Sequence, residues 1–152
     1  MPSTELKHSF RIAAPPEEVF AHLAEPSHYV GLSPLVVAVR DVRRDGGTVT
    51  YTAVERFRLL GVLRHDNLID ATLVAVPDGL PHSAEVFGEV RSPARVRMSY
   101  RFVIDRHGTG SAVTDTLYLR TPLGLLRFAA SQARAVQQAR ARVLTTRLTR
   151  PA

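Results

Sequence analysis

Residues 121–150 read TPLGLLRFAASQARAVQQARARVLTTRLTR, and this stretch decides the fold. Helix signals stand at its start, because Thr121 can cap free N–H groups and Pro122 suits the first helical turn. Residues that are apolar, with one exception, then recur at helical spacing: Leu126, Ala130, Ala133, Gln137, Leu144 and Leu148. The pattern predicts one long helix over 121–150. Since a helix of this length is not held by propensity alone, we expect its stripe to lie across a sheet and close an apolar chamber.

The exception in the stripe is Gln137. One interpretation is a partly exposed side chain at the edge of the sheet. The other is a polar group that points into a cavity and orients a ligand.

The same helix carries the whole excess of positive charge. The chain has a formal net charge of +6, and residues 1–120 are neutral in sum because their basic and acidic side chains are equal in number. The excess lies in Arg127, Arg134, Arg140, Arg142, Arg147 and Arg150. These arginines are spread around the helix without interleaved aromatic residues, so we expect no nucleic-acid site. A solvated face is the simpler interpretation, and a surface for an acidic partner is the alternative.

The rest of the chain is dominated by strand patterns. Alternating or apolar stretches lie at 5–12, 35–42, 49–59, 63–76, 83–90, 95–104 and 111–120. Hairpin signals at Asp45-Gly46-Gly47 and His107-Gly108-Thr109-Gly110 make consecutive strands antiparallel. Residues 14–26, which open with two prolines and two acids and end at Pro26, predict a short helix after the first strand. Residues 27–34 predict a second short helix or a turn. The prediction is an α+β fold, a curved antiparallel sheet of about seven strands wrapped around the C-terminal helix.

Composition excludes several kinds of site. The 152 residues suit a single domain over 1–152. There is no cysteine, so disulfides and thiolate chemistry are excluded. The six histidines show no ligand spacing, and we expect no metal and no cofactor. With no signal-peptide pattern and no membrane span, a cytoplasmic location is expected, and a homodimer stays open.

The opening of the chain carries a resemblance to a known family. Residues 8–26, HSFRIAAPPEEVFAHLAEP, resemble the first strand and first helix of the START/Bet v 1-like (SRPBCC) superfamily, and more narrowly of its bacterial polyketide cyclase/dehydrase-like members. Ser33-Pro34-Leu35-Val36 and the segment from Thr114 to Gly124 resemble later parts of that family. The resemblance implies a helix-grip fold with a deep apolar pocket. Relatives use this pocket to bind lipids, sterols, isoprenoid quinones or polyketides, and some cyclise or dehydrate the guest.

Strand phase and the helix stripe predict the residues of the pocket wall. We expect apolar and aromatic side chains to provide affinity and a few polar groups to fix orientation. The predicted ligand-binding residues are Tyr51, Phe57, Met98, Tyr100, Phe102, Leu126, Ala130, Ala133 and Gln137.

Catalysis would need a proton acceptor and a hydrogen-bond donor in that pocket. Glu55 is the first candidate for a base and Tyr100 for a hydrogen-bond donor. Asp115 is a further candidate, because it is a carboxylate on the apolar face of its strand. His8 and Tyr51 are weaker candidates. The alternatives are that Glu55 points to water and that the tyrosines are core residues.

Three hypotheses on function follow. The first is a protein that binds an apolar or aromatic small molecule, and the second is a polyketide cyclase/aromatase-type enzyme. The third is an interaction protein that uses its basic helix.

Overall fold

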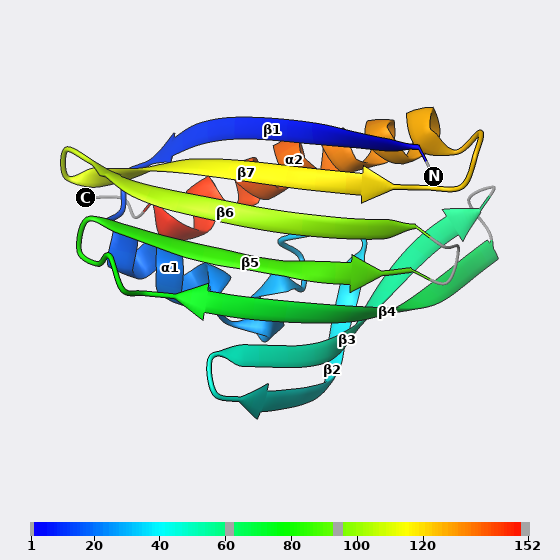
Figure 1. Cartoon of the computed structure of the whole chain (residues 1–152), viewed down its shortest axis with the longest axis horizontal. Helices are drawn as coiled ribbons and strands as arrows, with labels where there is room; N and C mark the ends of the chain where they lie inside the picture. The colour runs from blue at the N-terminus through cyan, green and yellow to red at the C-terminus, as the bar shows by residue number, and fades with distance from the viewer. Residues whose placement is uncertain (1, 60–62, 93–95, 150–152) are drawn as a thin grey trace.

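The computed structural model describes residues 2–59, 63–92 and 96–149. Its elements, in chain order, are β1 (Ser3–Ile12), α1 (Pro16–Leu23), the short 3₁₀ helix η1 (Pro26–Tyr29), β2 (Val36–Asp45), β3 (Thr48–Leu59), β4 (Leu63–Val76), β5 (Ser83–Arg91), β6 (Arg97–His107), β7 (Gly110–Arg120) and α2 (Leu126–Leu148). This order confirms the predicted one: a strand, two short helices, a run of strands and a long last helix (Figure 1).

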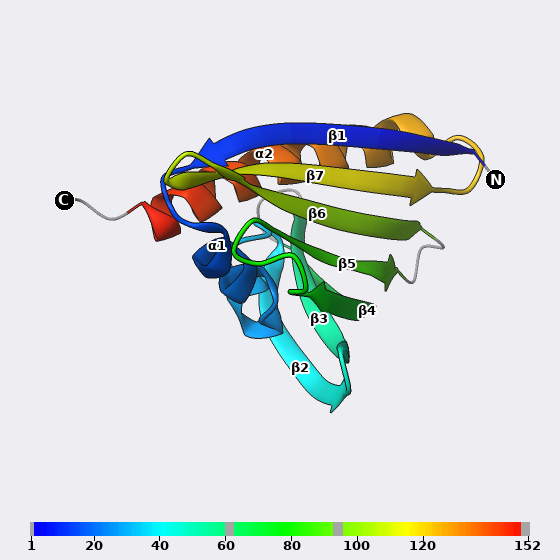
Figure 2. The same cartoon turned by 60° about the vertical axis from the view of Figure 1, so that its left-hand side comes forward.

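The strands form one antiparallel sheet in the order β1-β7-β6-β5-β4-β3-β2. From β2 to β7, each strand pairs with the next one. The turns between β2 and β3 and between β6 and β7 place Gly46 and Gly108 at positive φ angles of 62° and 60°, as the hairpin signals predict. The first strand is the exception, since β1 pairs with the last strand, β7. Figure 2 shows the strong curvature of the sheet, which creates a concave face. The helix-grip prediction is therefore confirmed.

The helices α1 and η1 close one end of the concave face (Figures 1 and 2). Pro16 suits the first turn of α1 because it has no N–H to lose. Val19 and Leu23 lie on the buried face of α1, which packs on β5, β6 and β7. The Tyr29 hydroxyl donates to the Leu23 carbonyl oxygen at 2.6 Å, so η1 is tied to the end of α1.

The predicted start of the long helix at Thr121 is wrong. The helix begins at Leu126, five residues later. Thr121 is buried, and its N–H donates to the Pro2 carbonyl at 3.1 Å, so this residue still belongs to the sheet edge. Gly124 then adopts a φ of 90°, which a helix does not allow. The cap-like Thr-Pro pair thus starts a turn and not a helix.

The helix α2 lies along β1 and β7, at one edge of the concave face (Figures 1 and 2). Gln137 is only 1% exposed, and its amide nitrogen donates to the carbonyl oxygens of Leu6 at 3.1 Å and Asp115 at 3.0 Å. Both sequence interpretations of Gln137 are corrected, because it is neither exposed nor directed into a cavity. It fastens α2 to the two strands below it.

Gln137→Leu should therefore destabilise the fold. The change keeps the size of the side chain but removes the two hydrogen bonds that join α2 to the strands, and we expect a loss of about 1–3 kcal/mol in the free energy of unfolding. Urea denaturation measures it. Gln138→Leu, at the exposed neighbouring position, is the matched control and should change stability by less than about 0.5 kcal/mol. Equal denaturation midpoints for the two variants would show that these bonds do not anchor α2.

Candidate functional site: a cavity between the sheet and the last helix

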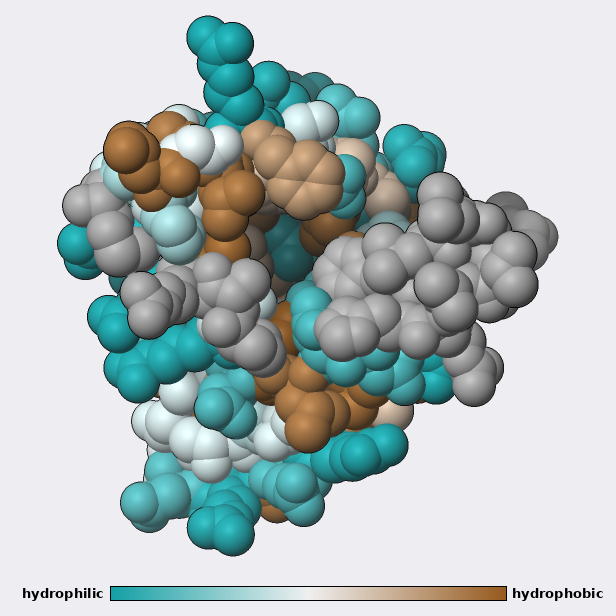
Figure 3. Space-filling view, turned by 90° about the vertical axis from the view of Figure 1, so that its right-hand side faces the viewer, coloured by the Kyte–Doolittle hydropathy of each residue, from teal (hydrophilic) through white to brown (hydrophobic). Residues whose placement is uncertain are grey.

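A cavity of about 390 Å³ lies between α2 and the concave face of the sheet. This volume falls within the usual range of small-molecule sites. Figure 3 looks at the end of the molecule opposite α1, where a hollow opens between hydrophobic side chains. The lining residues come from both layers and from the segment after η1: Tyr29, Ser33, Leu35, Val36, Tyr51, Ala53, Glu55, Asn67, Ile69, Ala71, Val90, Ser92, Val96, Met98, Tyr100, Leu117, Leu125, Phe128, Ala129, Gln132, Ala133, Val136 and Arg140.

Four of the residues that were predicted from the sequence to bind a ligand lie in this wall. Tyr51, Met98, Tyr100 and Ala133 line the cavity. Phe57 belongs to β3, but its side chain lies outside the described part of the structure. Four other predicted residues are not brought to the wall: Phe102, Leu126, Ala130 and Gln137.

The rotation of α2 about its own axis explains why Leu126, Ala130 and Gln137 do not line the cavity. An α-helix turns by 100° per residue, so the stripe through Ala130 and Gln137 lies roughly 80–100° around the helix from the one through Ala129 and Val136. The first stripe packs on β1 and β7, and the second faces the cavity. Most of the predicted stripe thus attaches the helix, whereas Ala133 and the neighbouring stripe form the wall.

The rim of the cavity at the start of α2 is apolar and exposed. Leu125 and Phe128 line the cavity, and Phe128 is 67% exposed. Leu123, in the turn before the helix, is 90% exposed. Sequence periodicity missed these residues because they lie at and before the helix start, outside the predicted stripe.

Tyr100 is held rigidly on the floor of the cavity. It pairs with Gly88 across β5 and β6, and its hydroxyl donates to the Thr72 carbonyl on β4 at 2.8 Å. A side chain at Gly88 would collide with that carbonyl and with the Tyr100 hydroxyl. Glycine at this position therefore makes room for Tyr100, whose hydroxyl is already occupied by the backbone.

Three tyrosines gather at the inner part of the cavity. Burial raises the pKa of Tyr51 to about 12, and burial likewise raises the pKa of Tyr29 and of Tyr100 well above the usual value. Their hydroxyls are protonated hydrogen-bond donors at neutral pH. Tyr51 interacts with the Tyr100 hydroxyl, while Tyr29 donates to a backbone carbonyl.

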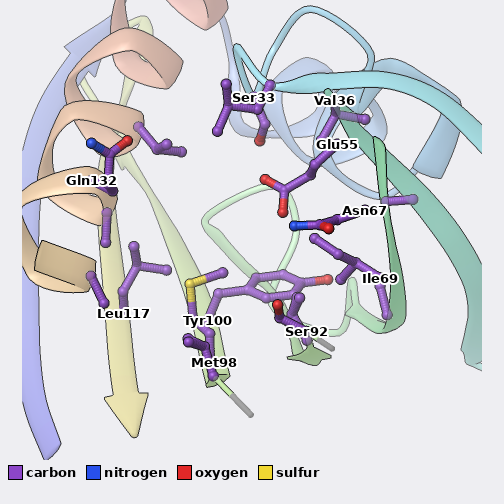
Figure 4. Close-up of a pocket in the computed structure, with 18 of the residues that line it drawn as sticks. Ser33, Val36, Glu55, Asn67, Ile69, Ser92, Met98, Tyr100, Leu117 and Gln132 are labelled. Carbon is purple, nitrogen blue, oxygen red and sulfur yellow. The ribbon is translucent and has the colours of Figure 1, made fainter. Parts of the chain in front are cut away.

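Glu55 projects into the cavity from β3, next to Asn67 of β4 (Figure 4). The β3–β4 register runs without a shift from Thr48 to Leu59, so Glu55 keeps the inward phase of Tyr51. Burial raises the pKa of the Glu55 carboxyl above its usual value. Within the described part of the chain, this carboxyl has no hydrogen-bond or ion-pair partner. The alternative that Glu55 points to water is thus wrong.

The raised pKa of Glu55 makes stability depend on pH. The folded state favours the neutral form of Glu55. The stability that Glu55 contributes to the fold is therefore fully present below the ordinary glutamate pKa of about 4.3, and it is lost as the pH rises through the higher pKa of the folded state. Glu55→Gln is neutral at every pH. We expect it to match the parent protein in acid and to melt at a higher temperature at pH 7, with exposed Glu89→Gln as control. A pH-independent difference would contradict the assignment.

Asp115, the third catalytic candidate, does not reach the cavity. It is fully buried (0% exposed) and its Oδ2 accepts hydrogen bonds from Arg140 Nη2 at 2.6 Å and Nε at 3.2 Å. Arg140 itself is 5% exposed and lines the cavity, with its guanidinium 4.9 Å from the centre of the Phe102 ring. Asp115 therefore positions Arg140, a lining residue that sequence reasoning assigned to a solvated face.

The basic face of the last helix is smaller than its sequence suggests. Arg140 is buried. Arg147 donates to the carbonyl oxygens of His28 at 2.6 Å and Val30 at 2.9 Å, so it joins the end of α2 to η1 and to the residue that follows η1. Arg150 lies outside the described residues. The described arginines of α2 that remain exposed without such contacts are Arg127, Arg134 and Arg142.

Membrane-spanning helices and metal-binding clusters are absent among the described residues. None of their helices combines the length and apolar character that crossing a bilayer requires. No group of three or more of their His, Asp and Glu side chains is arranged to hold a metal ion.

Solved structures with this fold include an aromatase/cyclase and a START superfamily protein. The Zhui aromatase/cyclase of Streptomyces sp. R1128 superposes with a TM-score of 0.77 at 13% identity, over 97% of this chain and 94% of that one. A START superfamily protein of Mycobacterium smegmatis gives 0.68 at 11% identity, over 95% and 96%. The protein TTHA0849 of Thermus thermophilus gives 0.66 at 19% identity, over 95% and 97%. At these identities the likeness concerns the fold.

Sequence comparison assigns the family. No curated protein matches the chain by sequence. The profile of the family described as "Polyketide cyclase / dehydrase and lipid transport" matches residues 3–149, nearly the whole chain. The chain therefore belongs to the polyketide cyclase/dehydrase and lipid transport family.

Proposed function

We propose that the protein binds an apolar or aromatic small molecule, of lipid, isoprenoid or polyketide type, in the cavity between the sheet and α2. The observation that carries the proposal is a cavity of about 390 Å³ whose wall is largely aliphatic and aromatic, with few polar groups. Burial of apolar surface provides affinity in such sites, at about 25 cal/mol per Å². Membership of a family with cyclases and lipid transporters supports this proposal.

Native mass spectrometry tests this function. The freshly purified protein is measured before and after extraction with organic solvent. We expect an added mass that extraction removes, or, after incubation of the bare protein with aromatic and isoprenoid compounds, one-to-one complexes. A protein that stays bare with every compound tested would contradict the proposal.

A second candidate is catalysis of a cyclisation in the same cavity. Glu55 supports it, because its carboxyl faces the cavity without a hydrogen-bond or ion-pair partner among the described residues, and burial raises its pKa in the direction that a general base needs. The base would take a proton from the carbon between two carbonyl groups of a poly-β-ketone. Glu55→Gln should then abolish cyclised product, measured by chromatography, while ligand affinity stays within about twofold. Equal turnover by both proteins would exclude Glu55 as the base.

The remaining expectations stay predictions. A cytoplasmic location is tested by cell fractionation, and a homodimer by light scattering on a sizing column. The third function, binding of an acidic partner by the basic helix, now rests on Arg127, Arg134 and Arg142. It predicts an association that weakens steeply with salt.

A further inference from the structure

Arg140, unlike the neighbouring Tyr29 and Tyr100, keeps a donor that no described group uses. The hydroxyls of Tyr29 and Tyr100 donate to backbone carbonyls. Arg140 uses Nε and Nη2 for Asp115. Its Nη1 has no hydrogen-bond partner among the described residues, although Arg140 lines the cavity. An N–H donor on a planar, fixed group is therefore available to a guest molecule.

The charge of this donor is already compensated. Asp115 is fully buried and lies 2.6 Å from Arg140 Nη2, so the pair is neutral as a unit. The Phe102 ring beneath the guanidinium holds its plane in place. Glu55, on the opposite wall, is a carboxyl group and adds no positive charge to the cavity. Among the described lining residues, no second basic side chain accompanies Arg140.

A neutral but directional donor discriminates between kinds of oxygen. A carboxylate loses its hydration when it enters an apolar cavity, and only an uncompensated cation repays that cost. A carbonyl or phenol oxygen gives up much less hydration and still accepts the hydrogen bond. We propose that Arg140, positioned by Asp115, selects guests with a neutral carbonyl or phenol oxygen at their inner end and discriminates against carboxylates.

This inference rests on the proposed function, and a matched set of three probes separates the two. The probes are methyl naphthyl ketone, naphthoate and isopropenylnaphthalene, which share one shape and differ in the oxygen atoms. Calorimetry or displacement of a fluorescent probe measures their dissociation constants. We expect the ketone to bind roughly tenfold more tightly than the hydrocarbon, and naphthoate to bind more weakly than either.

Asp115→Asn tests the compensation. It frees the charge of Arg140, and we expect naphthoate to bind at least about tenfold more tightly than to the parent protein and to overtake the ketone. Because a lone buried charge destabilises the fold, the double variant Asp115→Asn with Arg140→Leu, which has neither the charge nor the donor of Arg140, serves as a second test. There the ketone should bind no better than the hydrocarbon. Arg142→Gln, at an exposed position of the same helix, should bind the three probes in the same order of affinity as the parent protein.

A measurement on the parent protein does not depend on any variant. The carbonyl stretch of the bound ketone in isotope-edited infrared spectra should lie at lower wavenumber than in hexane, because it accepts a hydrogen bond. The double variant should return it to the hexane value.

The outcomes are distinct. If the hydrocarbon binds and the ketone gains nothing from its oxygen, the inference on Arg140 is wrong while the binding function stands. If naphthoate binds most tightly to the parent protein, Asp115 does not compensate Arg140 and the inference is likewise wrong. If none of the three probes binds, both proposals fall.

Discussion

Ala133→Trp should abolish ligand uptake and leave the protein folded. Ala133 lines the cavity from α2 and is almost fully buried. An indole at this position occupies space that a guest would need, so we expect affinity to fall by about a hundredfold or more, equivalent to about 3 kcal/mol. Since the new side chain enters an existing space, the free energy of unfolding should change by less than about 2 kcal/mol. Ligand titration and urea denaturation measure the two effects.

The matched control for this change lies two residues away. Ala135 is on the exposed side of the same helix, and Ala135→Trp should leave both affinity and stability close to those of the parent protein. Unchanged uptake by the Ala133→Trp variant would place the guest elsewhere on the molecule.

Arg140→Leu should produce the largest loss of stability among the single variants considered. The change leaves the Asp115 carboxylate buried without its partner, and Asp115 Oδ1 has no hydrogen bond among the described residues to compensate. Breaking a buried ion pair in this way costs about 3–5 kcal/mol. Denaturation midpoints in urea, at constant pH, measure the effect.

The double variant Arg140→Leu with Asp115→Asn tests the reason for this loss. It removes both charges, so most of the stability should return, although Arg140→Leu alone is strongly destabilised. Arg142→Leu, at an exposed position, is the control for the loss of an arginine. Additive effects of the two substitutions would show that the pair does not act as a unit.

Local sequence rules predicted the sheet well because its strands follow them. Glycine turns such as Asp45-Gly46-Gly47 require positive φ angles that few other residues tolerate. Between β3 and β4 the register has no shift, so the inward phase of Glu55 could be read directly from alternation. Alternation likewise placed Met98, Tyr100 and Asp115 on the concave face.

The ion pair with Asp115 was missed, although the sequence held a signal for it. A carboxylate on the inward phase of a strand needs a cationic partner, and Asp115 stands on that phase. The partner had to come from the arginines of the last helix, which carries all the excess charge. Which of them it is depends on how α2 is rotated on β1 and β7, and periodicity alone does not determine this rotation.

The helix start and the cavity wall depend on the same tertiary geometry. Thr121 and Pro122 carry the chemistry of a helix start, but the edge contact of Thr121 with Pro2 keeps the chain in the sheet. Leu125 and Phe128 reach the rim only because the helix begins after the turn at Gly124. Local patterns predict that a stripe exists, and packing decides which neighbouring stripe faces the guest.

The most direct test of the central claim uses the methyl group of Met98, which lines the cavity. The chain contains two methionines, so labelling their methyl groups gives a simple NMR spectrum, and the signal lost in Met98→Leu identifies Met98. On addition of an aromatic ligand we expect nuclear Overhauser effects between ligand protons and this methyl group, absent in Ala133→Trp. A ligand that binds tightly while the Met98 signal stays unchanged would contradict binding between the sheet and α2.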